Sequence, residues 1–162
     1  MSGDAPSLRA REILRNKSVD SLPDASRLST DDTFFGGMLE AVFLVAAADG
    51  VLTKEEVGSL IDLVSQVGGE GLTPGQLSTM MTEFSASLEV QGRGARLTAL
   101  SAAVKDPAAR REILGFAALV ALCDGELAPS ELFVLHSIGK AFELDAAAVN
   151  GVVRSLKTAL GE

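Results

Sequence analysis

A repeat with a spacing of 75 residues constrains the fold of this chain more than any other feature of its sequence. The segment Leu44–Leu52, which reads LVAAADGVL, aligns without a gap with Leu119–Leu127, which reads LVALCDGEL. After a slip of three residues, Leu77 aligns with Val149. Each copy therefore predicts an apolar helix, a tight Asp-Gly turn, a second helix and a capped third helix. Two such units can bury their apolar faces against each other, so we expect a bundle related by a pseudo-twofold axis.

The composition indicates an all-α fold. Among 162 residues there are 23 Ala and 23 Leu, but only seven Phe and no Trp or Tyr. Ala and Leu have the highest helix propensities, whereas strands are rich in β-branched and aromatic residues. Because about 150 residues form one ordinary domain, we expect a single bundle of about seven helices.

Capping and turn residues place the helices along the chain. Thr53 followed by Glu56 predicts a capping box, and Thr73 followed by Pro74 and Gln76 predicts another helix start. The predicted breaks and caps lie at Asp49-Gly50, Gly68-Gly69, Gln91–Gly94, Asp106-Pro107, Asp124-Gly125 and Asp145. All breaks are short, as antiparallel neighbouring helices require. The two repeat units then span about 33–88 and 107–159.

The first 28 residues differ from the rest of the chain. They are rich in Ser and Pro, and we expect only Leu8, Ile13, Leu14 and Val19 to bury much apolar surface. We therefore expect a mobile N-terminal arm at 1–28, partly disordered or forming a short helix. The all-helical domain is expected at 29–162.

Charge and cysteine content limit the partners and the compartment. The 14 Lys and Arg residues against 22 Asp and Glu give a formal net charge of -8, which argues against nucleic-acid binding. A single Cys allows no intramolecular disulfide, so we expect a reducing compartment, the cytoplasm. No apolar run approaches the ~18 residues of a spanning helix, so no transmembrane segment is predicted.

The repeated pattern resembles a known family. An apolar helix, Asp-Gly, one exposed residue, an apolar residue and a Glu seven places after the Asp occur twice, with Asp49 and Glu56 in one copy and Asp124 and Glu131 in the other. This pattern resembles the TerB tellurite-resistance family, whose fold is shared by the N-terminal domain of DjlA-type co-chaperones. The resemblance covers about 35–153 and is most specific over 100–149. It implies a bundle of about seven helices and a role in tellurite, metal or general stress response.

The resemblance also implies a divalent-metal site at Asp49, Glu56, Asp124 and Glu131. A carboxylate at the C-terminal end of a helix is unfavourable unless a donor or cation compensates it, which applies to both Asp residues. All-oxygen ligands favour Ca²⁺, Mg²⁺ or Mn²⁺ over Zn²⁺. If the two turns meet, we expect the four carboxylates to share one acidic region.

A purely structural interpretation of the same residues stays open. Each Asp can accept backbone N–H groups in an Asx-turn, with the following Gly in a left-handed conformation. Glu56 can close its capping box with Thr53, but Glu131 follows Ala128, which has no side-chain oxygen to complete such a box.

Other polar residues are assigned ordinary roles. His136 is expected to be partly buried and Cys123 to be a small buried thiol. No sequence pattern supports a Ser-His-Asp set or a phosphate-binding loop, so an enzyme is not predicted. A basic band is expected to form a solvated face; it consists of Arg93, Arg96, Lys105, Arg110 and Arg111.

Two functional hypotheses follow. The first is a non-enzymatic TerB-like stress-response domain with a divalent cation at its turns, acting with a protein partner that the resemblance places at a membrane. The second is a helical adaptor for protein interactions in which the acidic turns are purely structural.

Overall fold

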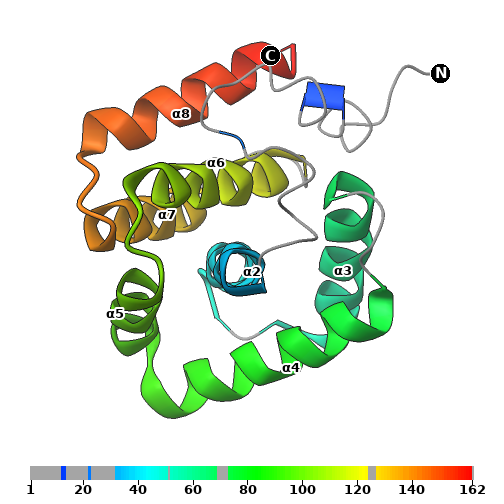
Figure 1. Ribbon diagram of the computed structural model, residues 1–162. Coiled ribbons are helices and arrows are strands. Elements are labelled where there is room, and N and C mark those ends of the chain that lie inside the picture. Colours follow the sequence, from blue (N-terminus) through cyan, green and yellow to red (C-terminus); the bar gives the residue numbers. More distant parts are fainter. Residues whose placement is uncertain are drawn as a thin grey trace, which may run out of the picture.

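The protein is an all-α bundle, as predicted. The fold is seen in a computed structural model that describes residues 12–13, 22, 32–50, 52–68, 73–123 and 127–161, and no strand occurs among them. The helices are α2 (Asp32–Ala46), α3 (Lys54–Gly68), α4 (Pro74–Gln91), α5 (Arg93–Ala103), α6 (Pro107–Cys123), α7 (Pro129–Ala141) and α8 (Ala146–Ala159) (Figure 1). None of these helices is both long and apolar enough to cross a membrane.

Side-chain caps start several helices where the sequence predicts them. Thr73 and Gln76 form a complete capping box at α4, with Pro74 at the first helical position. Asp106 caps α6 by accepting a hydrogen bond from Ala109 N, at 2.9 Å. Asp145 caps α8 in the same way. These bonds satisfy N–H groups that the first helical turn leaves without a partner.

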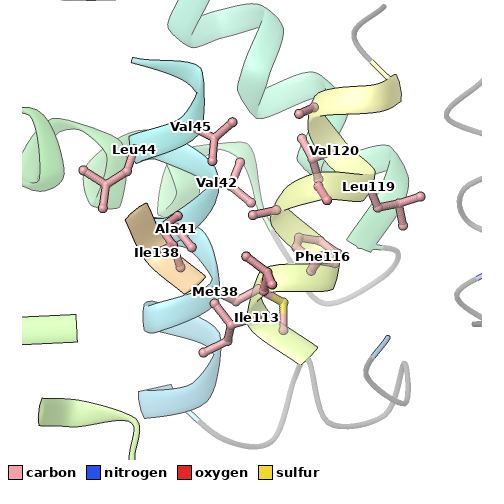
Figure 2. Packing of buried hydrophobic residues seen from close by; sticks show 14 of the residues in the cluster. Met38, Ala41, Val42, Leu44, Val45, Ile113, Phe116, Leu119, Val120 and Ile138 are labelled. Atoms are coloured by element: carbon pink, nitrogen blue, oxygen red, sulfur yellow. The ribbon is translucent and has the colours of Figure 1, made fainter. Parts of the chain in front are cut away.

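The core forms around α2, which is almost surrounded by the other helices (Figure 1). Met38, Val42 and Val45 of α2 face Phe116 and Val120 of α6, and all are at most 2% exposed (Figure 2). Both helices are apolar over most of their circumference, which is typical of a helix inside a bundle rather than at its surface.

A glycine lets α2 approach its neighbours closely. A Cβ atom at Gly37 would lie 3.1 Å from Val104 and 3.2 Å from Leu100, beside Ile113 of α6. A larger residue there would displace these buried side chains, so the close contact of α2 with α5 and α6 requires a small residue.

Several helix contacts correspond between the two predicted repeat units. In the first unit α2 packs on α4 and α3 packs on α4; in the second α6 packs on α8 and α7 packs on α8. Across the units, α2 contacts α7 and α6 contacts α3. However, α6 also packs on α7, and α2 makes no contact of similar extent with α3 among the described residues, so the repeat organisation and its pseudo-twofold axis stay a prediction.

One break between helices is shorter in the structure than the sequence predicts. The interruption expected at 91–94 is confined to Gly92, which has a φ of 87°, and α5 begins at Arg93 instead of Ala95. A positive φ favours glycine, so one residue is enough to turn the chain, and Gly94 is accommodated within the helix.

Little of the predicted N-terminal arm lies within the described residues. Ile13 is 7% exposed and packs with the core, as expected. Leu22 is fully buried in the same core, so the prediction that only Leu8, Ile13, Leu14 and Val19 bury much surface is wrong. The rest of the arm, and with it the predicted disorder, lies outside the part of the chain that the structure describes.

The prediction of a solvated basic band is wrong for three of its five members. Lys105 and Arg111 are exposed, but Arg96 lies against the buried Glu40 of α2. Arg96 Nε donates to Glu40 Oε2 at 2.7 Å and Nη2 donates to Oε1 at 2.9 Å. The hydrogen bond with Glu40 raises the pKa of Arg96 above its ordinary value. This bidentate pair fastens α5 to α2.

Arg93 and Arg110 instead bind carbonyl groups at the C-terminal ends of helices. Arg93 Nη2 donates to the carbonyl oxygen of Ala48, just after α2, at 3.0 Å. Arg110 donates to the carbonyls of Ser101 and Val104 at the end of α5 and to that of Phe142 after α7. Helix C-terminal ends carry partial negative charge and lack internal N–H partners, so they attract these guanidinium groups.

Candidate functional site

The first Asp-Gly turn leaves its carboxylate exposed. Backbone hydrogen bonds from Ala48 N to Val45 O and from Gly50 N to Ala47 O close the turn, and Gly50 has a φ of 144°. Asp49 is exposed, and its carboxylate accepts no hydrogen bond from any described residue. The described residues therefore show no Asx-turn bond to Asp49, while Val51, the usual donor of such a bond, lies outside them.

Glu56 forms the predicted capping box at the start of α3. Thr53 N donates to Glu56 Oε1 at 2.8 Å, and Glu56 N donates to Thr53 Oγ1 at 3.1 Å. The box occupies Oε1 of the carboxylate. It also holds the side chain near the first turn of α3.

Glu131 forms half of the same arrangement at the start of α7. Ala128 N donates to Glu131 Oε1 at 2.8 Å, although Ala128 has no oxygen for the reciprocal bond. The glutamate of the second unit therefore has a structural role that the sequence did not predict. The missing hydroxyl removes only one of the two box bonds, because the bond to the carboxylate needs only a backbone N–H.

The two glutamates line one pocket. Its volume is about 290 Å³, and it lies where α3 meets the start of α7. Its carboxylates come from both predicted units, Glu55 and Glu56 from the first and Glu131 from the second. The remaining lining residues are Ala46, Leu52, Ser59, Leu60 and Leu63. The structure thus brings Glu56 and Glu131 to one region.

Neither of the other two predicted site residues is among the described residues that line this pocket. Asp49 is not among its lining residues, and Asp124 lies outside the described residues. Within the described ranges, no three His, Cys, Asp or Glu side chains are grouped closely enough to hold a metal ion. The four-carboxylate site of Asp49, Glu56, Asp124 and Glu131 stays a prediction.

The sequence contained a signal for the rest of the pocket. Glu56, Ser59, Leu60 and Leu63 recur at intervals of three and four residues, which places them on one face of α3. That face looked like an ordinary amphipathic stripe. Only the position of Glu131 on another helix shows that its polar edge borders a second carboxylate.

His136 and Cys123 lie away from this pocket's lining. His136 Nε2 is 3.1 Å from Asn150 Oδ1, a contact that joins α7 to α8. Cys123 is half-buried at the end of α6 and packs against the core. Neither residue is among those lining the pocket.

Comparison with known proteins gives one result. A family model described as "Tellurite resistance protein TerB" matches residues 37–153, which is most of the chain and includes both Asp-Gly turns. No curated protein and no solved structure matches the chain.

Proposed function

Because the chain belongs to the TerB family, we propose that it is a non-enzymatic stress-response domain whose acidic pocket between α3 and α7 binds a divalent cation. The proposed setting is the cytoplasm, the proposed stress is tellurite or metal ions, and the proposed partner is a membrane-associated protein. The observation that carries the proposal is the meeting of Glu55, Glu56 and Glu131 at one pocket.

The chemistry of this donor set suits a hard cation. Glu55, Glu56 and Glu131 line one pocket but are not grouped as metal ligands in the described structure, so their side chains would have to converge on a bound ion. Carboxylate oxygens are ligands for Ca²⁺, Mg²⁺ and Mn²⁺, whereas Zn²⁺ prefers nitrogen and sulfur. Glu56 and Glu131 each accept a backbone N–H bond at Oε1 at the start of a helix, so both side chains are held beside the pocket.

Asp49 supports the cation hypothesis independently. Its carboxylate stands just after the C-terminal end of α2, where the helix dipole disfavours a negative charge. No described backbone N–H compensates it. We propose that Asp49, with Asp124 of the second turn, supplies additional negative charge that attracts the cation to this region.

The test uses glutamine substitutions that keep the caps. At α4 the Oε1 atom of Gln76 accepts the bond from Thr73 N, so glutamine can perform the capping role in this chain. The double variant Glu56→Gln, Glu131→Gln therefore removes two charges and retains both caps. In the parent protein, Ca²⁺, Mg²⁺ or Mn²⁺ at 100 times its dissociation constant should stabilise the fold by ~2.7 kcal/mol. Thermal unfolding of the double variant should lack this gain.

The controls separate binding from screening. An inert salt at matched ionic strength gives the baseline, and Glu83→Gln, which changes an exposed residue of α4, should retain the full gain. Metal content of the purified protein, measured with and without a chelator, identifies the ion. If the parent gains no more stability from any of the three ions than from the inert salt, the cation site does not exist.

The stress-response role needs a measurement in cells. Cells that produce the parent chain should survive more tellurite than cells that produce the Glu56→Gln, Glu131→Gln variant at the same level. Equal survival of the two strains would show that the pocket glutamates are not needed for tellurite resistance.

A specific observation also favours the adaptor alternative. Phe133 on α7 is 65% exposed and Val90 on α4 is 84% exposed, which is unusual for large apolar side chains. Under this alternative Glu56 and Glu131 serve only as caps. Divalent ions would then leave stability unchanged, while Phe133→Ser would abolish capture of the partner.

A further inference from the structure

A second pocket lies on the other side of Leu52, between the end of α2 and the C-terminal half of α4. Its volume is about 320 Å³, near the lower end of the range for small-molecule sites. Its apolar walls are Phe43, Ala47, Leu52 and Leu88. Ser85, Glu89 and Arg93 supply the polar groups. Apolar walls with a few polar groups are the usual composition of a ligand site.

Arg93 is held in place by the backbone. Its Nη2 donates to the carbonyl oxygen of Ala48 at 3.0 Å, and the side chain is half-buried. No described carboxylate forms an ion pair with it. A guanidinium has five N–H donors, so the bond to Ala48 leaves donors for a second acceptor. The group is therefore oriented and charged, and its positive charge has no described anionic partner.

Glu89 places the opposite charge in the same pocket. It lies four residues before Arg93, with the break at Gly92 between them, and forms no ion pair with any described residue. One pocket thus presents a cation, an anion and an apolar wall. A ligand that complements all three needs a carboxylate, an ammonium group and an apolar side chain.

We propose that this pocket binds a free α-amino acid with an apolar side chain, through Arg93, Glu89 and the wall formed by Phe43, Leu52 and Leu88. The Arg93 guanidinium takes the carboxylate and Glu89 takes the ammonium group. The side chain lies against Phe43, which is 2% exposed and fixed by its ring contact with Phe84. An α-amino acid carries both groups, the carboxylate and the ammonium, as substituents of one carbon.

The pocket depends on a part of the chain outside the two predicted repeat units. Arg93 belongs to α5, which lies between the units, and no segment of the second unit aligns with α5. The proposal is therefore independent of the cation site, whose glutamates come from both units. Loss of cation binding would leave it unaffected.

NMR titration of the full chain with three probes tests the proposal. Leucine carries both charges, 4-methylpentanoate lacks the ammonium group and 3-methylbutylamine lacks the carboxylate. Leucine should shift the amide signals of Ala47, Gly50, Leu52 and Leu88, with a dissociation constant on the order of 1 mM or below. Each of the other two probes should bind at least about tenfold more weakly, because a charge-assisted bond is lost.

Three variants assign the groups. Glu89→Gln should weaken leucine and 3-methylbutylamine but leave 4-methylpentanoate unchanged. Arg93→Gln should weaken leucine and 4-methylpentanoate but leave 3-methylbutylamine unchanged. Ser85→Leu should fill the pocket and abolish binding of all three probes. Glu89 and Ser85 take no part in the bond to Ala48, so their variants retain the cap of α2.

Several outcomes would overturn the proposal. One is the absence of shifts around the pocket at about 10 mM leucine, and another is shifts that persist in Ser85→Leu. Equal binding of leucine and 4-methylpentanoate, unaffected by Glu89→Gln, would remove the amino-acid assignment. If Arg93→Gln lowers thermal stability yet leaves leucine affinity unchanged, Arg93 acts only as a cap of α2.

Discussion

The starts of α3 and α7 occupy matched positions in the two predicted units but are capped differently. At α3 the hydroxyl of Thr53 and the carboxylate of Glu56 exchange two hydrogen bonds. At α7 Ala128 provides no oxygen, and only the bond from its N–H to Glu131 forms. The carboxylate bond is therefore common to both starts and the hydroxyl bond is not. Both Glu56 and Glu131 also line one pocket, so capping does not account for everything they share.

The surroundings of α2 and α6 differ more strongly. Glu40 of α2 is buried and paired with Arg96 of α5, whereas the matched position of α6 is Gly115. The first unit is thus joined to α5, a helix outside the repeat, through the Glu40–Arg96 pair. The second unit has no equivalent pair at Gly115. Repetition of the sequence preserves the helices, but long-range polar contacts can still differ between the copies.

The largest expected effect tests whether the two units share one core. Leu44 and Leu119 are matched by the repeat and are 1% and 0% exposed. Replacing either by Ala leaves a buried cavity, which should lower the free energy of unfolding by about 2–5 kcal/mol. Urea unfolding followed by circular dichroism measures both variants.

A matched control for this comparison is Val90→Ala, because Val90 is exposed and should cost little. If the units share one core, both leucine variants should unfold in a single transition with similar losses. Two separate transitions, or a loss confined to one variant, would mean that the units fold independently.

The next effect tests the dependence of α2 on α5. Glu40→Gln removes the charge that receives two hydrogen bonds from Arg96, and should cost about 1.5–3 kcal/mol. Arg96 stays protonated at both about pH 6 and pH 9, so its titration should not change the loss in the free energy of unfolding between these pH values. Chemical unfolding at both pH values measures it, with exposed Glu83→Gln as the control. A loss no larger than that of the control would show that the pair does not stabilise α2.

The smallest effect converts one helix start into the other. Thr53→Ala gives α3 the arrangement of α7 and should destabilise the fold by about 1 kcal/mol. Ala128→Ser gives α7 a hydroxyl and should stabilise it by about 0.5 kcal/mol. Thermal unfolding measures both shifts, which should have opposite signs. Destabilisation by Ala128→Ser would mean that the start of α7 cannot accept the hydroxyl bond.

The sequence predicted the helices and many of their ends because these depend on neighbouring residues. Pro74, Pro107 and Pro129 each begin a helix, and the box of Thr53 with Glu56 needed only a spacing of three. The predicted break near Gly92 was too long. A single glycine with a positive φ interrupts the helix, and the good helix formers beside it stay helical, which the sequence pattern alone did not indicate.

The partners of the arginines could not be predicted because they come from distant parts of the chain. Arg96 meets Glu40 across 56 residues of sequence, and Arg93 meets Ala48 across 45. The candidate site was predicted in part for a similar reason. Repetition singled out Glu56 and Glu131, but whether they share a pocket depends on how α3 and α7 pack.

Arg110 has a consequence for how the protein opens. Its guanidinium binds the last carbonyls of α5 and the Phe142 carbonyl after α7, and it lies 5.4 Å from the centre of the Phe142 ring. The ends of α5 and α7 therefore share one hydrogen-bond donor, the Arg110 side chain of α6. When one helix end frays, Arg110 loses the hydrogen bonds to that end. The guanidinium is then less firmly positioned, so its hydrogen bonds to the other helix end weaken as well. Amide protons in the last turns of α5 and α7 should consequently exchange with solvent through one common opening, so that two helices distant in sequence behave as a single cooperative unit.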